Sequence, residues 1–345
     1  MTVKISRQTP VINNLPPGKI PKEAINGQSP VILKGVVKHW PLVMLGKQSS
    51  RKVVDYLTPY YNGKPSFAYV GGSDIKGRFF YNEDATQLNY QSEQVQVDAF
   101  LERLIEVEDQ PNPPSLYIAS NVIDTHFPGL REHNDLTIPR PQSDIPLESN
   151  RVSIWIGNKT TACAHYDASD NLACCIMGKR RFTLFPPSQV ENLYPGPLHL
   201  TPGGQALSMV DFDNPDFDKY PNFKIALDHA EIAKLEPGDV LYLPSMWWHQ
   251  VEGLANFNVL VNYWWSESPL YCGAAMNVLY HAMLSMRHKP EHEKRAWKHL
   301  FDYYIFDNTG KAAAHLPEQA QGYLGELDPQ KARSLRAMLL NKLNR

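Results

Sequence analysis

The sequence lacks the features that mark membrane and secreted proteins. No apolar stretch approaches the length of a membrane span, and the first ten residues contain no apolar core of the kind that signal peptides carry. Only 4 cysteines occur in 345 residues, and they show neither disulfide nor zinc spacing. Adjacent Cys174 and Cys175 would point to opposite faces of a strand, so we expect no bridge between them. These absences predict a reduced, cytoplasmic protein without a membrane partner.

The sequence also lacks a strong charge of either sign. Lys and Arg number 34 against 36 Asp and Glu, the formal net charge is −2, and no long basic run occurs. We therefore expect no dedicated nucleic-acid surface, and only a local basic patch stays open. The 28 prolines are spread along the chain rather than gathered in a linker. With 345 residues, of which 43% are hydrophobic, the chain can bury a full hydrophobic core. Its length fits one large domain, or one domain plus an appendage.

A strand-rich region is predicted between residues 150 and 266. Short apolar runs alternate there with Gly and Pro, which favours an antiparallel barrel or jelly roll. We expect strands at residues 152–157, 171–177, 181–185, 240–243 and 258–265. The long insertion after the third of these carries residues 211–217 (DFDNPDF) and predicts a functional flap.

The regions on either side have a different character. Residues 1–145 are mixed, with strands expected at 30–37 and 115–119 and helical spacing at 47–57 and 97–107. After Pro269, helices are expected at 270–288, 291–306 and 328–343. The last of these begins with Asp328-Pro329, and its apolar stripe consists of Ala332, Leu335, Met338, Leu339 and Leu343. This apolar stripe could pack on the chain's own barrel or pair with a second copy of the chain, and the sequence favours neither. We predict a mainly β domain at 1–266, with α elements at its start, and a C-terminal helical region at 267–345.

Two histidines and an aspartate form the candidate catalytic and metal-binding set. His165 and Asp167 are two residues apart, and His249 follows 84 positions after His165 (249 − 165). Residues two apart share a face of a strand, so both can point into a barrel while Tyr166 points away. We expect His249 to close a later strand and to complete the set. Two imidazoles and one carboxylate are the ligands of a mononuclear non-haem Fe(II) site with three open positions. The alternative is a barrel histidine hydrogen-bonded to a neighbouring acid.

The pair of a histidine and an acid two residues later is weak evidence by itself. With 12 histidines in the chain, about one such pair is expected by chance, and three occur. His133 stands in a polar segment before Asp135, without a strand leading from it. His229 lies among charged residues before Glu231 and is interpreted as a solvated surface histidine. Predicted strands on both sides of His165 favour it over these two.

An oxygenase of this type commonly needs 2-oxoglutarate as a two-electron donor. Its distal carboxylate requires a cation in a dry pocket. Lys179 and Arg180 follow the Gly178 turn, and only one of the two can face the inside of a barrel. The neutral hydrogen-bonding candidates are Tyr117, Thr161, Asn171 and Asn262. The alternative interpretation of residues 179–181 is a solvated basic turn.

Several motifs, in order, resemble the JmjC/cupin-like (cupin-8) family of Fe(II)- and 2-oxoglutarate-dependent oxygenases. They are residues 154–157 (IWIG), 164–167 (AHYD), 178–187 (GKRRFTLFPP), 193–195 (LYP), 210–216 (VDFDNPD), 237–244 (PGDVLYLP), 247–249 (WWH) and 261–264 (VNYW). The resemblance implies a double-stranded β-helix (jelly-roll or cupin fold) and a homodimer formed through the C-terminal helices. It also implies Fe(II) at His165, Asp167 and His249, with 2-oxoglutarate held at Tyr117, Asn171, Arg180 and Asn262.

This chain departs from the family pattern in three places. The family's co-substrate lysine corresponds to Arg180, which keeps the charge and allows a two-pronged grip. The family's co-substrate threonine corresponds to Ala162, and Thr161 is the residue that would replace it. An Arg-Gln pair that holds the substrate in asparaginyl hydroxylases of the family corresponds to Ala206 and Leu207. Hydroxylation of the same substrate therefore does not follow.

The sequence-based hypothesis is an Fe(II)- and 2-oxoglutarate-dependent dioxygenase. It would use O₂ to hydroxylate a protein side chain, a peptide or a small molecule, with release of succinate and CO₂. Tyr166, Trp247 and Trp248 are interpreted as core residues or as pocket walls. Two alternatives are a catalytically silent cupin-type binding protein and another metal-dependent cupin enzyme, whose sites commonly use more histidines.

Overall fold

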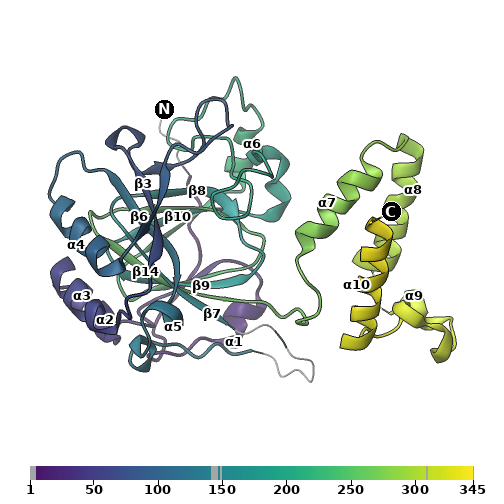
Figure 1. The fold of residues 1–345 in the computed structure, drawn as a ribbon, viewed down its shortest axis with the longest axis horizontal. Coiled ribbons are helices and arrows are strands. Elements are labelled where there is room, and N and C mark those ends of the chain that lie inside the picture. The colour runs from purple at the N-terminus through teal and green to yellow at the C-terminus, as the bar shows by residue number, and fades with distance from the viewer. Residues whose placement is uncertain (1–4, 141–146, 148–149, 308–309, 345) are drawn as a thin grey trace. The chain divides into compact units, whose positions relative to one another are not determined.

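A computed structural model describes residues 5–140, 147, 150–307 and 310–344 of the chain (Figure 1). The chain divides into two compact units. Unit 1 comprises residues 1–141 and 149–266, and unit 2 comprises residues 142–148 and 267–345. Each unit is described by itself.

Unit 1 is built on two β-sheets. Within the described residues, the larger sheet has the strand order β1-β2-β12-β9-β14-β7-β6-β3-β5, and the smaller has the order β11-β10-β13-β8-β4. The larger sheet contains β1 (Val11–Ile12), β2 (Val31–Leu33), β3 (Ser66–Gly71), β5 (Gln91–Val95), β6 (Ser115–Val122), β7 (Arg151–Gly157), β9 (Asp170–Met177), β12 (Val240–Leu243) and β14 (Asn258–Trp265). The smaller contains β4 (Arg78–Phe79), β8 (Thr161–Tyr166), β10 (Arg180–Phe185), β11 (Glu231–Leu235) and β13 (Trp248–Gly253).

The chain passes repeatedly from one sheet to the other between β7 and β14. β7, β9, β12 and β14 belong to the larger sheet, whereas β8, β10, β11 and β13 belong to the smaller. Neighbouring strands within this set are antiparallel, and the parallel pairs β1·β2 and β4·β8 lie at the sheet margins. Apolar side chains of both sheets, such as Cys175, Phe182 and Leu260, meet in one buried cluster between them. This arrangement is the double-stranded β-helix that the sequence predicts.

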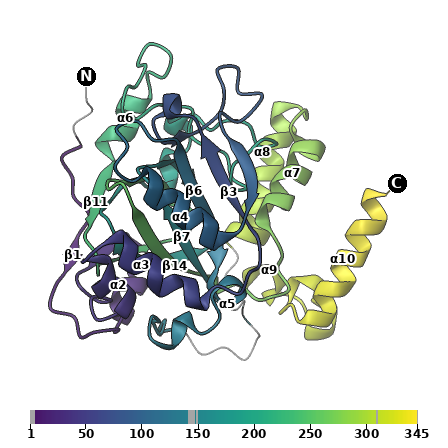
Figure 2. The ribbon, with the colours of Figure 1, turned by 60° about the vertical axis from the view of Figure 1, so that its left-hand side comes forward.

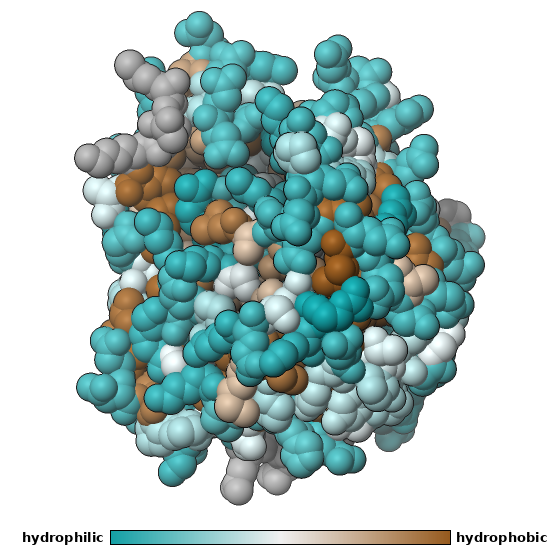
Figure 3. All heavy atoms as spheres, turned by 90° about the vertical axis from the view of Figure 1, so that its left-hand side faces the viewer, coloured by the Kyte–Doolittle hydropathy of each residue, from teal (hydrophilic) through white to brown (hydrophobic). Residues whose placement is uncertain are grey.

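Short helices cover the outer face of the larger sheet. They are α1 (Lys22–Asn26), α2 (Pro41–Gly46), α3 (Ser50–Leu57), α4 (Val97–Val107) and α5 (Ile123–His126), with 3-10 turns η1 (Thr58–Tyr60), η2 (Ser73–Ile75) and η3 (Leu130–Glu132). Figure 2 shows α3 and α4 in front of this sheet. The buried residues of α4 recur at helical spacing, so one face packs on the strands and the other meets solvent. Figure 3 accordingly shows a mainly hydrophilic surface with small apolar patches on the side where these helices lie.

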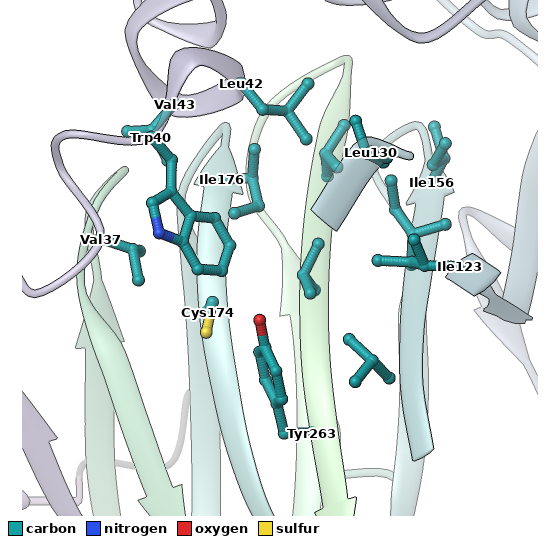
Figure 4. Packing of buried hydrophobic residues seen from close by; sticks show 14 of the residues in the cluster. Val37, Trp40, Leu42, Val43, Ile123, Leu130, Ile156, Cys174, Ile176 and Tyr263 are labelled. Carbon is teal, nitrogen blue, oxygen red and sulfur yellow. The ribbon is translucent and has the colours of Figure 1, made fainter. Parts of the chain in front are cut away.

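The largest buried cluster lies between these helices and the larger sheet. Trp40 and Leu42 come from the start of α2, and they lie over strands that carry Cys174, Ile176 and Tyr263 (Figure 4). Cys174 belongs to this cluster and Cys175 to the one between the sheets, as the alternation along a strand predicts. Residues such as Trp40 and Tyr263 are about 1% exposed. The helical layer therefore fixes the strands whose other face lines the site.

Three predictions about the strands need correction. The predicted strand at 30–37 ends at Leu33, because the chain turns at Gly35 with φ +68°. The predicted strands did not include β1, β3, β4 and β5 in the N-terminal region or β8, β11 and β13 in the strand-rich region. His249 does not close a strand but lies second in β13, since the chain leaves β12 and crosses to the other sheet before it pairs again.

The insertion between β10 and β11 is compact. It contains η4 (Pro187–Gln189), η5 (Glu191–Leu193) and α6 (Phe223–Asp228). Phe223 and Leu193 from the insertion pack against Phe185 and Trp248 of the smaller sheet, so much of it covers that sheet's outer face. A functional role for this segment stays a prediction.

Unit 2 is helical. It contains α7 (Ala275–Met286), α8 (Glu291–Phe301), the π-helical turn η6 (Asp302–Phe306), α9 (Lys311–Ala314), η7 (Glu318–Ala320), η8 (Gly322–Leu324) and α10 (Pro329–Leu343). Asp328 caps α10 by accepting from the backbone N–H groups of Gln330 and Lys331, as predicted. Of the predicted stripe only Ala332 is buried. Among the described residues, no helix has the length and apolar character needed to cross a membrane.

The hydroxyl of Tyr263 links the core to Asp135 and Leu136, in the segment that precedes β7. Its hydroxyl donates to Asp135 Oδ1 at 2.7 Å and accepts from the buried N–H of Leu136 at 3.0 Å. Tyr263→Phe removes the donor to Asp135 and one of two acceptors of that N–H, since Asp135 Oδ1 also accepts from it at 2.8 Å. We therefore expect a loss of about 0.5–1.5 kcal/mol in the free energy of unfolding, measured by urea titration. A change below about 0.5 kcal/mol would contradict this role.

Candidate metal centre and adjoining cavities

The pairing of β8 with β13 brings the two predicted histidines together. His165 and His249 are direct cross-strand partners, with ring centroids 4.4 Å apart. Asp167 follows the end of β8, and its Oδ2 lies 3.7 Å from Nε2 of His249. One ligand atom from each of the three residues lies within 4.8 Å of the others. Within the described part of the chain, this is the one such group of His, Cys, Asp or Glu residues.

Backbone carbonyl groups orient both imidazole rings. Nδ1 of His165 lies 2.8 Å from the carbonyl oxygen of Cys163, and Nδ1 of His249 lies 2.9 Å from that of Trp247. A carbonyl oxygen only accepts, so each Nδ1 carries a proton, and the neutral form of either ring then presents a lone pair on Nε2. The Nε2 side of both rings and the Asp167 side chain therefore converge on one point.

The surroundings of His249 favour its neutral form. The side chain is 4% exposed, and burial lowers its pKa to about 4, with the neighbouring His165 acting in the same direction and Asp167 against it. At neutral pH the imidazole is thus unprotonated, which is the form that binds a metal ion.

The other sequence candidates do not reach this centre. His133 and His229 are exposed and belong to no group of metal-ligating residues within the described chain. Tyr166 and Trp248 pack edge to face, with ring centroids 5.0 Å apart, in the cluster on the outer side of the smaller sheet. Trp247 packs against the cluster between the sheets. Core packing is therefore the role of these three aromatic residues.

Asp170 ties the turn before β13 to the end of β8. Its Oδ1 accepts from the hydroxyl of Tyr242 at 3.2 Å and from the backbone N–H of Ser245 at 3.1 Å. The N–H of Met246 donates to the carbonyl oxygen of Asp167 at 2.7 Å, and Met246 takes a left-handed conformation with φ +66°. The turn that leads to His249 is therefore fastened at two points to the segment that carries Asp167.

Arg180 is the buried one of the two candidate cations. Its side chain shares a face of β10 with Phe182 and Leu184, which face the space between the sheets, and it is 2% exposed. Lys179 is exposed and pairs with Glu236 at 3.0 Å. Nε and Nη2 of Arg180 are buried without a hydrogen-bond partner among the described residues. A buried guanidinium without partners is costly, so the position suits an anion that supplies them.

Tyr117 lies beside Arg180. Burial raises the pKa of Tyr117 to about 12, although the adjacent guanidinium of Arg180 lowers it. The phenol therefore keeps its proton at neutral pH and can donate a hydrogen bond to the same anion.

The neutral candidates differ in where the structure places them. Asn171 is buried, and its Oδ1 has no partner among the described residues. Oδ1 of Asn262 accepts from Nε1 of Trp155 at 2.7 Å. The register of β8 against β13 shifts by one residue between His165 and Ala162, so that Ala162 and His165 line the same cavity. Thr161 lines neither this cavity nor the adjoining one.

Two connected cavities adjoin the triad. The first, of about 50 Å³, is lined by the three triad residues together with Tyr117, Trp155, Ala162, Asn171, Ala173, Phe182, Val251, Leu260, Asn262 and Trp264. The second, of about 260 Å³, shares Tyr117, Trp155, Ala162, His165 and Trp264 with the first. A further cavity of about 210 Å³ contains none of the triad residues.

Most of the aromatic residues at these cavities were not predicted from the sequence. Trp264 lies two residues after Asn262 on β14, so alternation along that strand was the available signal for it. Tyr69, Phe79 and Tyr90 come from β3, β4 and the residue before β5, and no spacing in the sequence links them to the triad. Leu207 lines the larger cavity and Ala206 is buried, so neither offers a polar group to a substrate.

Known proteins match this chain over most of its length. The family model described as the cupin-like domain matches residues 17–271. The chain is 27% identical over 285 residues to tRNA wybutosine-synthesizing protein 5 of Gallus gallus, covering 77% of this chain and 79% of that protein. It is 28% identical over 245 residues to lysine-specific demethylase 8 of Xenopus tropicalis, covering 69% and 48%. It is 35% identical over 160 residues to JmjC domain-containing protein D of Dictyostelium discoideum, covering 43% and 34%. The match thus spans about half the length of the demethylase and about a third of the length of the JmjC domain-containing protein.

The Asp170 contacts predict an effect on metal affinity. Asp170→Ala removes both hydrogen bonds at Oδ1 and should weaken Co(II) or Mn(II) binding about 10- to 100-fold, as loss of an orienting partner does. Asp170→Asn keeps an acceptor oxygen and should restore most of the affinity. Calorimetry measures the dissociation constants, and Asp109→Ala, an exposed aspartate far along the sequence, is the control. Equal affinity in Asp170→Ala and the control would contradict this role.

Proposed function

The chain belongs to the cupin-like domain family, and on that premise we propose that it is an Fe(II)- and 2-oxoglutarate-dependent oxygenase. The observation that carries the proposal is the triad His165, Asp167 and His249 in the same barrel as Arg180, a buried cation with two unpartnered nitrogens. A metal site alone would fit many cupin-type proteins. Arg180 itself lines neither cavity, but it is next to Tyr117, which lines the triad cavity, and this buried cation gives a reason for a dicarboxylate co-substrate.

The triad fits a mononuclear iron ion. Two neutral imidazoles and one carboxylate provide three ligands, and such a set leaves positions open for a chelating co-substrate and O₂. His165 and His249 would bind through Nε2, because their Nδ1 protons are held by backbone carbonyl groups. Softer thiolate ligands are absent from the group, which suits iron better than a structural zinc ion.

The residues around Arg180 fit 2-oxoglutarate. The distal carboxylate would accept from Nε and Nη2 of Arg180, which lack acceptors, and from the hydroxyl of Tyr117. Asn171 has a free acceptor nearby on β9, while the acceptor of Asn262 is taken by Trp155. Ala162 offers no hydroxyl, and Thr161 lies away from the cavity, so the polar contacts of a bound co-substrate would rest on Arg180 and Tyr117.

The protein's own residues position the reactants and exclude water. When bound, Fe(II) and 2-oxoglutarate supply the chemistry that converts O₂ and a C–H bond into a hydroxyl group, with release of succinate and CO₂. Trp155, Phe182 and Leu260 enclose the cavity around the triad and keep bulk water from the reacting atoms. Tyr117 remains protonated and serves as a hydrogen-bond donor rather than as a base.

The relatives support this chemistry without fixing a substrate. One is named for wybutosine synthesis on tRNA and another for lysine demethylation, so proteins similar to this chain are named for different substrates. We propose a protein side chain, a peptide or a small molecule as the substrate. A catalytically silent binding protein is the second candidate, yet all three metal ligands are present. Another metal-dependent cupin enzyme would leave the buried Arg180 without a role.

The oxygenase proposal is tested by anaerobic titration with Fe(II) and 2-oxoglutarate, followed by succinate production in air. The unmodified protein should develop a weak visible metal-to-ligand band and form succinate, and Asp167→Ala should do neither. Arg180→Met should keep metal affinity but weaken 2-oxoglutarate binding about 10- to 100-fold, because charge-assisted hydrogen bonds are lost. Lys179→Met removes a neighbouring, exposed charge and is the matched control. Undiminished turnover in Asp167→Ala, or equal losses in both cation variants, would contradict the proposal.

We further propose that unit 2 pairs with a second copy of the chain. Large apolar side chains of this unit are exposed, among them Leu284 at 79%, Phe306 at 73% and Ile305 at 63%. Met283, Met286, Trp297, Phe301 and Phe306 also line a groove of about 390 Å³ between α7 and α8. Exposed apolar surface on this scale is typical of protein interfaces, and the family resemblance implies a homodimer of this kind.

Light scattering coupled to size-exclusion chromatography measures this association. The protein should run as a dimer, and Leu284→Glu combined with Phe306→Glu should give the mass of a monomer, because two buried charges oppose the contact. Val190→Glu, at an exposed apolar residue of unit 1, is the control and should leave the dimer intact. A monomeric protein at high micromolar concentration would refute the pairing.

A further inference from the structure

The larger of the two connected cavities has a composition that selects for one class of substrate. We call it the aromatic cavity, and its rings are Tyr69, Phe79, Tyr90, Tyr117, Trp155 and Trp264. On the basis of the proposed oxygenase function, we propose that the oxidised group is an uncharged aromatic side chain of a polypeptide, bound in the aromatic cavity. Because His165 lines this cavity as well as the triad cavity, a group bound there lies next to the metal centre.

The rings of the aromatic cavity stack on one another. Phe79 and Tyr117 lie 24° from parallel with centroids 6.0 Å apart, and Tyr117 and Trp155 lie 30° from parallel at 5.9 Å. Three near-parallel rings from β4, β6 and β7 thus form a continuous series, and Tyr117 and Trp155 of this series also line the triad cavity. Because these rings already cover one another's faces, a planar guest gains edge contacts on this wall, in addition to the burial of its surface.

The charge of the cavity disfavours a cationic substrate. Among the described residues that line it, no Asp or Glu occurs, and Arg151 is the one Lys or Arg residue. The guanidinium of Arg151 lies 5.7 Å over the ring of Trp264, so it already takes the cation-binding face of that ring. A lysine or arginine side chain would therefore lose its hydration beside a like charge, without a carboxylate to replace it.

The remaining rings do not form a cage for a methylated ammonium group either. Tyr69, Phe79 and Tyr90 contact one another, with centroids 4.8 to 6.0 Å apart. Aromatic cages instead hold a cation between separated ring faces. The trio is a packed wall, and Tyr69 is further fixed because its hydroxyl donates to the carbonyl oxygen of Pro202 at 3.0 Å.

The charge of the surroundings favours a side chain over a nucleobase. A volume of about 260 Å³ suits one ring-bearing group, which either of them could supply. A nucleic acid would need several cations along its phosphate path, and the cavity has Arg151 alone in a chain of net charge −2. A polypeptide requires no such path. Pro202, Gln205 and Leu207 of the insertion lie at the wall, where they can contact a peptide on either side of the guest.

O₂ and 2-oxoglutarate account for all the atoms and electrons of the proposed reaction. A C–H bond of the aromatic residue breaks and a C–OH bond forms, with one oxygen atom of O₂ entering the substrate. The other oxygen atom enters succinate, and 2-oxoglutarate loses its carboxyl group as CO₂. The product residue is heavier by one oxygen atom, which makes it visible by mass spectrometry.

The test uses the full chain with Fe(II), 2-oxoglutarate and peptide libraries of random flanks around one fixed central residue. Central Phe, Tyr, His or Trp should be oxidised about two- to tenfold more efficiently than Leu of comparable size, the contribution expected from ring contacts. Central Lys or Arg should be at least about 100-fold poorer, because an unpaired charge is buried. Oxidation centred on Lys, Arg or Asp, or of oligonucleotides offered in parallel, would overturn the proposal.

A measurement without peptide separates this proposal from the oxygenase itself. Slow succinate formation and metal binding in the absence of substrate report on the triad and Arg180 alone. If they occur while no aromatic peptide in the library is oxidised, the substrate class is wrong and the oxygenase stands. If neither occurs, the proposed function fails first.

Variants of the cavity wall give a second, independent readout. Tyr90→Leu removes one ring and should lower the preference for aromatic over aliphatic centres, while Tyr90→Phe keeps the ring and should restore it. Phe67→Leu removes an exposed ring from β3 outside the cavity and serves as the matched control. Gln205→Glu adds a carboxylate of the same size and should raise oxidation of central Lys at least tenfold. An unchanged preference in both Tyr90→Leu and Gln205→Glu would refute the role of this cavity.

Discussion

The antiparallel pairing of β8 with β13 is the contact on which the site depends. It places His165 opposite His249, although these residues are 84 positions apart (249 − 165). A slip of one residue would turn one imidazole to the outer face of the sheet, because side chains alternate along a strand. Tyr166 and Trp248 oppose that slip, since they are the next cross-strand pair and pack edge to face in the cluster on the outer side. The metal ligands on one face are thus held in register by aromatic packing on the other.

Buried polar groups give the barrel interior its specificity. Arg180 is surrounded by apolar strand residues, and two of its nitrogens have no partner among the described residues. A buried charge without partners lowers the stability of the fold unless an anion completes its hydrogen bonds. Its presence is therefore better explained by ligand binding than by a contribution to stability. Asn171 belongs to the same interior, with an acceptor left free on a neighbouring strand. The proposed site therefore combines three candidate metal ligands with a buried cation whose hydrogen bonds an anion would complete.

The two cavities come from different parts of the chain. Apart from Tyr117 of β6, the triad cavity is lined by residues of the segment from β7 to β14, which carries the motifs that the resemblance rests on. The aromatic cavity adds Tyr69, Phe79 and Tyr90 from the N-terminal region and Leu207 from the insertion. This division offers a physical reason why relatives named for a tRNA modification and for a lysine demethylation match the same chain. The proposed chemistry thus rests on the motif-bearing strands, whereas the proposed substrate cavity also draws on the elements that flank them.

The sequence by itself predicted the fold class and the candidate metal ligands. Strand alternation, turn residues and ordered motifs are local signals, and they led to His165, Asp167, His249 and to the two candidate cations. Local spacing allowed either Lys179 or Arg180 to face the inside of the barrel. The register of β10 in the folded sheet decided that Arg180 is the buried one. The sequence likewise placed His249 at a strand's end, whereas the crossing between the sheets puts it near a strand's start. The aromatic cavity and the Asp170 contacts were decided by tertiary structure alone. They join residues far apart in the chain, and no local pattern records which strands will become neighbours.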